Sequence, residues 1–322
     1  MSVDSANLRW LVLGASGFVG SAIAAELRAR DANVVTMSAP RLDSSATTAD
    51  AIVAAAHSPL ISSVREELCR AFTDIDVVIN AAGLATPSDG ESQALTGANA
   101  LLPAVAALAA HDAGVGRVVH LSSASVQGHR RVIDESAERS PFSAYSRSKA
   151  LGEEALELLL SSTAPTSVVT VRATSVQGIS RPTTLSLIKV AGSPIASVAA
   201  PGTAPTPVSS IDALAWFVVQ TGQHAGDVPA VVLQPWEGLS VSDVLTAAGG
   251  HAPRRLPRWL CRSVLATGYF TSRLLGERLH GPIRRVELMW FGQEQAPGWA
   301  EAVGLVPVPS AAALLEKAHQ AH

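Results

Sequence analysis

Short apolar runs along the chain alternate with longer segments in which apolar residues recur every three or four positions. The first run, residues 8–13, is continuous rather than alternating, which is typical of a strand buried on both faces of a sheet. The segment 18–30 then places Val19, Ile23 and Leu27 on one stripe, which predicts an amphipathic helix. Further strands are predicted at 34–37, 77–80, 118–122 and 168–172, and further helices at 48–56, 62–72, 91–113 and 143–160. This order of elements predicts an α/β fold with a doubly wound parallel sheet, the Rossmann fold.

The pattern changes after Arg172, where five prolines divide residues 180–209 into short pieces. Ser210 before an apolar run, and Ser240 with Asp243 three residues later, predict helix starts. Helices are also predicted at 258–279 and 311–320. We therefore expect a Rossmann domain in 1–172, which also receives segments from about 208–235, and a smaller, mostly C-terminal lobe in 173–322.

Composition and charge narrow the possible partners. Hydrophobic residues make up 48% of the chain and the net charge is −3, so neither nucleic acid nor an anionic membrane is expected from the bulk numbers. Cys69 and Cys261 are far apart and have no nearby His or Cys, so we expect neither a disulfide framework nor a metal site. Residues 1–5 lack the regions of a signal peptide. A cytoplasmic protein that acts on a small molecule is the expectation.

One segment invites a membrane interpretation. No stretch reaches the ~18 uninterrupted apolar residues of a membrane span, and the nearest, 259–275, is broken by Arg262 and Arg273. We expect no membrane span, and interpret this segment as an amphipathic helix that covers a core or a pocket. A helix lying on a membrane surface is the alternative.

A glycine-rich loop follows the first predicted strand and opens the first helix. Gly14 can make the sharp turn, Gly17 allows close approach of a pyrophosphate, and Gly20 allows the helix to pack on the strand. The helix N-terminus offers N–H groups and a partial positive charge to phosphates. The loop predicts a dinucleotide site whose contacts come from Gly14, Ser16, Gly17, Phe18, Val19 and Gly20.

The end of the second strand selects between cofactors. An acid there would bind the ribose 2′-hydroxyl of NAD, whereas a small residue with an arginine admits the 2′-phosphate of NADP. Ser38 occupies this place and Arg41 follows it, which favours NADP. NAD remains the alternative, with Asp43 as the acid if the turn is longer.

Tyr145 and Lys149 lie four residues apart in a predicted helix, so both side chains point to one face. A phenol is a poor base near neutrality, and a nearby ammonium would favour the phenolate. Tyr145 could then pass a proton to or from a substrate oxygen. Ser123, at the carboxyl end of a predicted strand, is the candidate hydroxyl beside it.

These motifs occur in order, and the chain resembles the extended short-chain dehydrogenase/reductase family over more than half its length. The resemblance is carried by 14–20, 76–83, Asn99, 122–128, 145–149 with Glu153, and 171–178. It implies that Ser123, Tyr145 and Lys149 are catalytic. It also implies cofactor contacts from Ala81, Ala82, Gly83, Asn99, Tyr145, Lys149 and Arg172. Family members often dimerise through the helices that carry Asn99 and Tyr145, so a homodimer is expected by analogy.

The chain also departs from the family pattern. Gln127 replaces a frequent tyrosine, and Ala124 and Ser125 replace the Asp-Glu pair of sugar dehydratases. Ser175 replaces an amide that commonly contacts the substrate, and the strand before Asp212 lacks an arginine for a diphosphate. Other arginines that could bind a diphosphate are Arg181, Arg254, Arg255 and Arg258.

The leading hypothesis is an NADP-linked ketoreductase that acts on a sugar-like or other small carbonyl compound. Three alternatives stay open: a nucleotide-sugar epimerase with retained NAD, a hydroxysteroid- or dihydroflavonol-type reductase, and an NADP-sensing regulator without chemistry. The Ser123, Tyr145 and Lys149 set favours an enzyme over a regulator.

Overall fold

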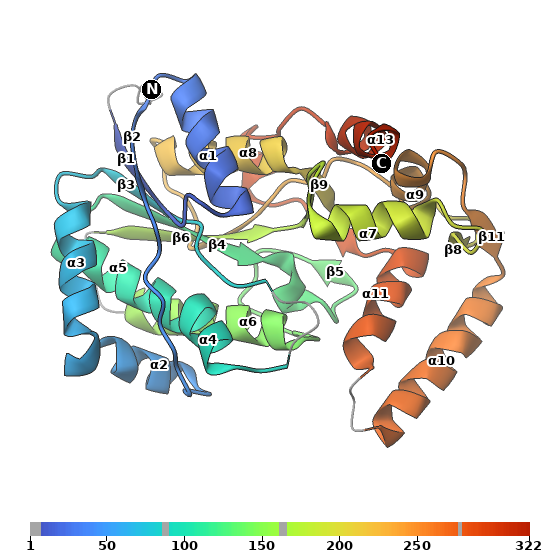
Figure 1. The fold of residues 1–322 in the computed structure, drawn as a ribbon, viewed down its shortest axis with the longest axis horizontal. Coiled ribbons are helices and arrows are strands. Elements are labelled where there is room, and N and C mark those ends of the chain that lie inside the picture. The colour runs from blue at the N-terminus through green and yellow to red at the C-terminus, as the bar shows by residue number, and fades with distance from the viewer. Residues whose placement is uncertain (1–7, 86–89, 161–165, 276–278) are drawn as a thin grey trace.

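The computed structural model of the chain describes residues 8–85, 90–160, 166–275 and 279–322. Its centre is a six-stranded parallel sheet in the order β10-β6-β4-β3-β1-β2 (Figure 1). The strands are β1 (Arg9–Leu13), β2 (Asn33–Met37), β3 (Val77–Asn80), β4 (Arg117–Ser123), β6 (Ser167–Ala173) and β10 (Val231–Leu233). The order reverses between β1 and β3, and in this fold a ligand binds at the carboxyl ends of the strands on either side of such a point.

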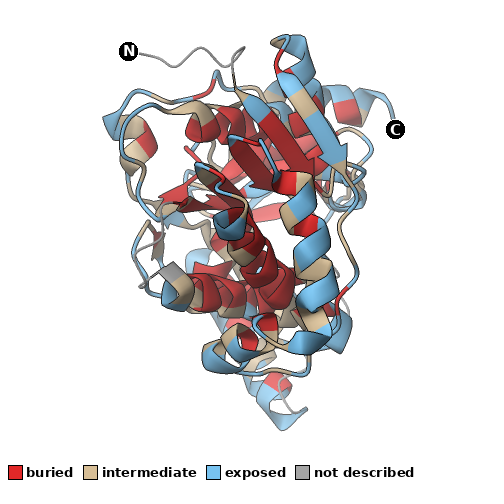
Figure 2. Cartoon of the chain, turned by 90° about the vertical axis from the view of Figure 1, so that its left-hand side faces the viewer, coloured by how far each residue is buried: buried red, intermediate tan, exposed pale blue. Residues whose placement is uncertain are grey.

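Helices cover both faces of the sheet (Figure 1). One face is covered by α1 (Phe18–Ala29) and α8 (Ile211–Gln223), and the other by α2 (Ala49–Ala56), α3 (Ser62–Phe72), α5 (Leu102–Asp112) and α6 (Ala144–Leu160). Figure 2 shows in red the central strands and the sides of the helices that face them. Two apolar clusters, one on each face, bury Leu11 and Val12 from the same strand, as its uninterrupted apolar run predicts.

The predicted strands and helices of the first half are confirmed to within two residues at either end. One helical segment differs in kind, because 91–113 consists of α4 (Gln93–Thr96), a π-helical turn η3 (Gly97–Leu101) and α5. A Cβ at Gly97 would lie 1.8 Å from the Leu42 carbonyl oxygen, so this turn approaches the chain after β2 as only glycine permits. The 3₁₀ turn η2 (Pro59–Ile61) precedes α3.

A smaller set of elements packs at the carboxyl end of the sheet, to the right in Figure 1. Its strands pair in parallel as β7 (Ser175–Gln177) with β9 (Val208–Ser210), β8 (Ser197–Ala199) with β11 (Arg254–Leu256), and β5 (Val132–Ile133) with β12 (Glu294–Gln295). Its helices are η4 (Ala124–Gln127), α7 (Pro182–Ala191), α9 (Val241–Gly249), α10 (Arg258–Leu274), α11 (His280–Phe291), α12 (Trp299–Ala302) and α13 (Ala311–Gln320). An apolar cluster joins α7, α9 and α13. The predicted caps at Ser210 and Ser240 are confirmed.

The prediction of one helix over 258–279 is wrong at its end. The helix α10 stops at Leu274, and a second helix, α11, begins at His280. Pro282 explains the new start, because proline is tolerated in the first turn of a helix but not in its interior. Residues 276–278 lie outside the described residues.

One helical run among the described residues, Gln93–Asp112, is long and apolar enough to cross a membrane. The structure buries 72% of its most apolar window, and α5 packs between α3 and α6. It is therefore a core helix of the Rossmann domain.

Candidate active site

The glycine loop leaves β1 and enters α1 without a side-chain cap. Gly14 has a φ of +84°, and a Cβ there would lie 2.8 Å from the backbone of Ala82. A Cβ at Gly20 would lie 2.2 Å from the Gly14 carbonyl oxygen, so α1 packs directly on the turn. Gly17 is the N-cap residue, and the first turn of α1 carries no acid. The first N–H groups of α1 are therefore available to an anion such as a pyrophosphate.

The other predicted loop contacts have three different placements. Ser16 lines a cavity beside the loop, whereas the Val19 side chain packs against the core, so that only its backbone can face a cofactor. Phe18 reaches the smaller lobe, where the Arg181 guanidinium lies 4.9 Å from its ring centroid. A Cβ at Gly178 would lie 2.6 Å from the same ring, which fixes the distance between the loop and α7.

The cavity beside the loop, of about 290 Å³, lies between α1 and the end of β2. It is lined by Ala15, Ser16, Ser21, Ala24, Arg28, Thr36, Met37 and Ser38. Ser38 thus lies where the sequence predicts the selecting residue, but Arg41 is exposed and is not part of the lining. The cation of this cavity is Arg28, which the sequence analysis missed. Its spacing of seven residues from Ser21 on α1 was the available signal.

The segment Ala81–Gly83 follows β3 and meets the glycine loop. Asn80 Oδ1 accepts a hydrogen bond of 3.1 Å from the Ala82 N–H, which shapes this segment. Asn99 is fully buried in η3, exchanges hydrogen bonds of 3.0 and 2.9 Å with the Leu84 backbone, and donates to Ser148 on α6 at 2.9 Å. Asn99 therefore ties this segment to α6.

Ser123 and Tyr145 come together at the end of β4. Both side chains line one cavity, and Ser123 Oγ lies 2.9 Å from Ser125 Oγ. Burial raises the pKa of Tyr145, and the Ser123 hydroxyl and the positive charge of Arg181 oppose this rise. Because both hydroxyls line the same cavity, they can contact one substrate oxygen.

Lys149 lies one turn beyond Tyr145 on α6. Its Nζ donates a hydrogen bond of 2.8 Å to the Leu121 carbonyl and would lie 3.0 Å from a Cβ at Gly83. Burial lowers the pKa of Lys149 to about 8, and the Glu153 carboxylate partly offsets this. The ammonium therefore lies beside the segment 81–83. The sequence analysis expected Lys149 to favour the Tyr145 phenolate, but the positive charge that opposes the rise in the Tyr145 pKa is that of Arg181.

Arg172 takes part in a buried ion pair rather than lining either cavity. Its Nη2 lies 2.7 Å from Glu153 Oε2, and the two side chains are 0% and 1% exposed. Glu153 also accepts from Ser122 at 2.6 Å and from Arg139 at 3.1 Å. Arg172 donates further to the backbone carbonyls of Asp134 and Ser136. The pair fixes α6 to β4 and β6, and so holds Tyr145 and Lys149 in register.

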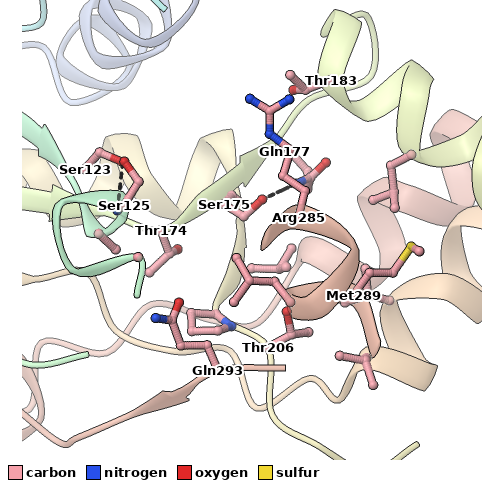
Figure 3. A pocket seen from close by; sticks show the side chains of 18 of the residues that line it. Ser123, Ser125, Thr174, Ser175, Gln177, Thr183, Thr206, Arg285, Met289 and Gln293 are labelled. Carbon is pink, nitrogen blue, oxygen red and sulfur yellow. Dashed lines mark hydrogen bonds between the residues drawn. The ribbon is translucent and has the colours of Figure 1, made fainter. Parts of the chain in front are cut away.

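A larger cavity, of about 530 Å³, opens beside Ser123 and Tyr145 (Figure 3). In Figure 3 Ser123 and Ser125 lie on one side and Met289 on the opposite side. Its apolar side chains come mainly from α7, α9 and α11: Leu187, Val190, Val241, Val244, Leu245, Leu288 and Met289. Among the described residues that line it, Arg285 carries the only charged side chain.

The family positions that are altered in this chain have specific contacts. Gln127 is buried and holds the chain after β5, with hydrogen bonds of 2.9 and 2.8 Å to Asp134. Two amides do line the larger cavity, but they come from Gln177, which hydrogen-bonds Ser175 and Thr184, and from Gln293. None of the four arginines proposed for a diphosphate lines this cavity; Arg285 of the unpredicted helix α11 does.

Three features together are typical of a dinucleotide-dependent class of enzymes. They are the glycine loop where the strand order reverses, Ser123 and Tyr145 at the end of β4, and the buried Lys149 one turn beyond Tyr145. The model of the NAD dependent epimerase/dehydratase family matches residues 10–201. The chain belongs to this family, as the resemblance predicts. A search of curated proteins found no match.

Several solved structures share the fold. MoeE5 in complex with UDP-glucose and NAD is 20% identical over 97% of each chain, with a TM-score of 0.60. UDP-glucuronic acid 4-epimerase from Bacillus cereus, in complex with UDP-glucuronic acid and NAD, is 17% identical over 97% of this chain and 98% of that one, with a TM-score of 0.62. The terminal R domain from the myxalamid PKS-NRPS pathway is 15% identical over 98% and 91%, with a TM-score of 0.64.

Proposed function

We propose that the protein is an NAD(P)-dependent oxidoreductase that interconverts a ketone and an alcohol, with Tyr145 as the proton donor or acceptor. The observation that carries this proposal is that Tyr145 and Ser123 both line the larger cavity, where the Ser123 hydroxyl is close enough to lower the pKa of Tyr145. A bound nicotinamide supplies the hydride acceptor or donor. Gly14 and Gly20 allow the loop to pack closely on Ala82 and on α1, and the first turn of α1 has neither a side-chain cap nor an acid, so the loop fits the pyrophosphate of this cofactor.

The proton transfer follows from the state of the two hydroxyls. Burial favours the neutral phenol of Tyr145, which can donate to a carbonyl oxygen. Ser123 holds the same oxygen in place. Arg181 stabilises the phenolate that remains, because its positive charge opposes the effect of burial on the Tyr145 pKa. Lys149 lies beside Gly83 and would hold the ribose of the nicotinamide.

The larger cavity supports a substrate with an apolar body, of the kind that hydroxysteroid- or dihydroflavonol-type reductases take. A sugar-like substrate would place hydroxyl groups against aliphatic walls at Val190, Leu245 and Met289, where they lose their hydrogen bonds to water. The polar lining around Ser123 and Gln177 suits one carbonyl end of the molecule.

Nucleotide-sugar epimerisation is the second candidate. The structures of MoeE5 and of the Bacillus cereus epimerase, which share this fold, hold UDP-sugars and NAD. Arg285 on the cavity wall could pair with a diphosphate.

The test is an assay of the purified full chain with NADPH or NADH and a set of ketones. A reductase is expected to consume added cofactor with a steroid or flavonoid ketone. An epimerase is expected to purify with tightly held NAD and to interconvert a UDP-sugar without net consumption. Turnover of a UDP-sugar alone would overturn the proposed substrate class.

We further propose a preference for NADP. The described residues that line the smaller cavity include no carboxylate, and they place Arg28 with Ser38 near the end of β2. Arg28→Ala is expected to weaken NADPH binding about tenfold, the equivalent of one charge-assisted hydrogen bond. NADH binding should change little. Fluorescence titration of both nucleotides measures this, and Arg41→Ala is the matched control because Arg41 does not line the cavity. Equal losses for both nucleotides would contradict the preference.

A further inference from the structure

The helix α10 forms a hairpin with α11 at the edge of the smaller lobe (Figure 1). The inner side of α10 buries Cys261, Leu265 and Ser272. These residues recur every four or seven positions, so they form one narrow stripe along the helix. Gly268 and Tyr269 are half-buried against α11, and the remaining residues of α10 are exposed.

The outer side of α10 carries large apolar side chains. Trp259 is 69% exposed, Phe270 64% and Leu274 73%. At 3.6 residues per turn these three lie within about 60° of one another, on the side opposite the buried stripe. We name them the outer face of α10. The interpretation of this segment as a cover over a core or pocket accounts for the inner stripe but not for the outer face.

The charged side chains of α10 and of the stretch before it all have one sign. Residues 244–275 contain no Asp or Glu, although the chain as a whole has a net charge of −3. They contain five arginines: Arg254, Arg255, Arg258, Arg262 and Arg273. Arg262 and Arg273 lie on the same flank of α10, about three turns apart, and each follows an aromatic residue of the outer face by three positions, Trp259 and Phe270 respectively.

We propose that α10 lies in the surface of a membrane that contains anionic lipids, with its outer face in the acyl boundary. An exposed apolar stripe with aromatic residues, flanked by arginines, is the pattern of an interfacial helix. The arginines complement the negative potential of anionic headgroups. A span is excluded for α10, because 17 residues with three arginines are too short and too charged.

The position of α10 would bring the larger cavity near the membrane surface. The neighbouring helix α11 contributes Leu288 and Met289 to the wall of the larger cavity. A chain held by α10 therefore carries an apolar cavity close to the lipid, where an apolar ketone concentrates. This use rests on the proposed function, whereas the membrane contact itself does not.

The test is co-sedimentation of the purified full chain with phosphatidylcholine vesicles, with and without phosphatidylglycerol. Binding is expected only with phosphatidylglycerol, and it should weaken as salt rises. Arg262→Glu with Arg273→Glu should weaken binding at least about thirtyfold. Trp259→Ser with Phe270→Ser should reduce it to a similar extent or more.

Matched controls are Leu60→Ser with Val308→Ser, which are 89% and 84% exposed elsewhere, and Arg70→Glu on α3. The controls should bind vesicles like the native chain, and circular dichroism should show all variants folded. Native binding by the α10 variants, or no binding of the native chain at low salt, overturns the proposal. So does light scattering that shows a dimer dissociating on Trp259→Ser with Phe270→Ser, since a second copy would then cover the outer face. Vesicle binding is measured without substrate, so a failed ketone assay leaves this result intact.

Discussion

Replacing Tyr145 with phenylalanine is expected to lower kcat by about two to four orders of magnitude, the usual contribution of a positioned acid or base. The change removes one oxygen, the phenolic hydroxyl of a residue that lines the larger cavity together with Ser123. The ring stays, so the packing of α6 and the glycine loop should be unaffected. Steady-state turnover with the best ketone measures kcat, and fluorescence titration measures cofactor affinity, which should remain near the native value.

The chain contains its own matched control, because Tyr269 is the only other tyrosine. Tyr269 lies on α10 and donates a hydrogen bond of 2.7 Å to Glu287, and it does not line the larger cavity. Tyr269→Phe should leave kcat unchanged. Undiminished turnover in Tyr145→Phe, or an equal loss in both variants, would remove Tyr145 from the role of acid or base.

Local sequence predicts the sheet domain and its glycine loop because short-range physics determines both. A buried parallel strand needs an apolar run. Gly14 is required by its contact with Ala82, just after the neighbouring strand β3, and Gly20 by its contact with Gly14. Tyr145 and Lys149 are likewise neighbours on one helix. Ser123 was reached from its place at a strand end, which parallel pairing brings to the ligand edge.

The residues that line the larger cavity could not be predicted from local sequence. Gln177 lies on β7, far along the chain from Arg285 and Met289 on α11, and only the packing of the smaller lobe brings these two elements together. Pro282 signals the start of α11, but the predicted helix was continued to residue 279 and no separate helix was predicted directly after it. Arg28 was missed for the same reason, because its place in the smaller cavity depends on how α1 packs against the end of β2.

Glu153→Gln is expected to lower the free energy of unfolding by about 3–5 kcal/mol, the usual effect of removing one partner of a buried ion pair. Arg172 is 0% exposed, and its remaining acceptors would be the neutral carbonyls of Asp134 and Ser136. The glutamine would also turn an amide donor toward guanidinium donors, including that of Arg139. Urea denaturation followed by circular dichroism measures the loss.

Glu157→Gln is the matched control on the same helix. Glu157 accepts a hydrogen bond of 3.0 Å from Arg139, but its side chain is 58% exposed. Water and salt screen such a pair, so the loss should stay below about 1 kcal/mol. Equal effects of the two substitutions would show that burial does not set the strength of the Glu153–Arg172 pair. A Glu153→Gln variant that loses stability should also lose turnover, because the ion pair holds α6, and with it Tyr145, against the end of β4.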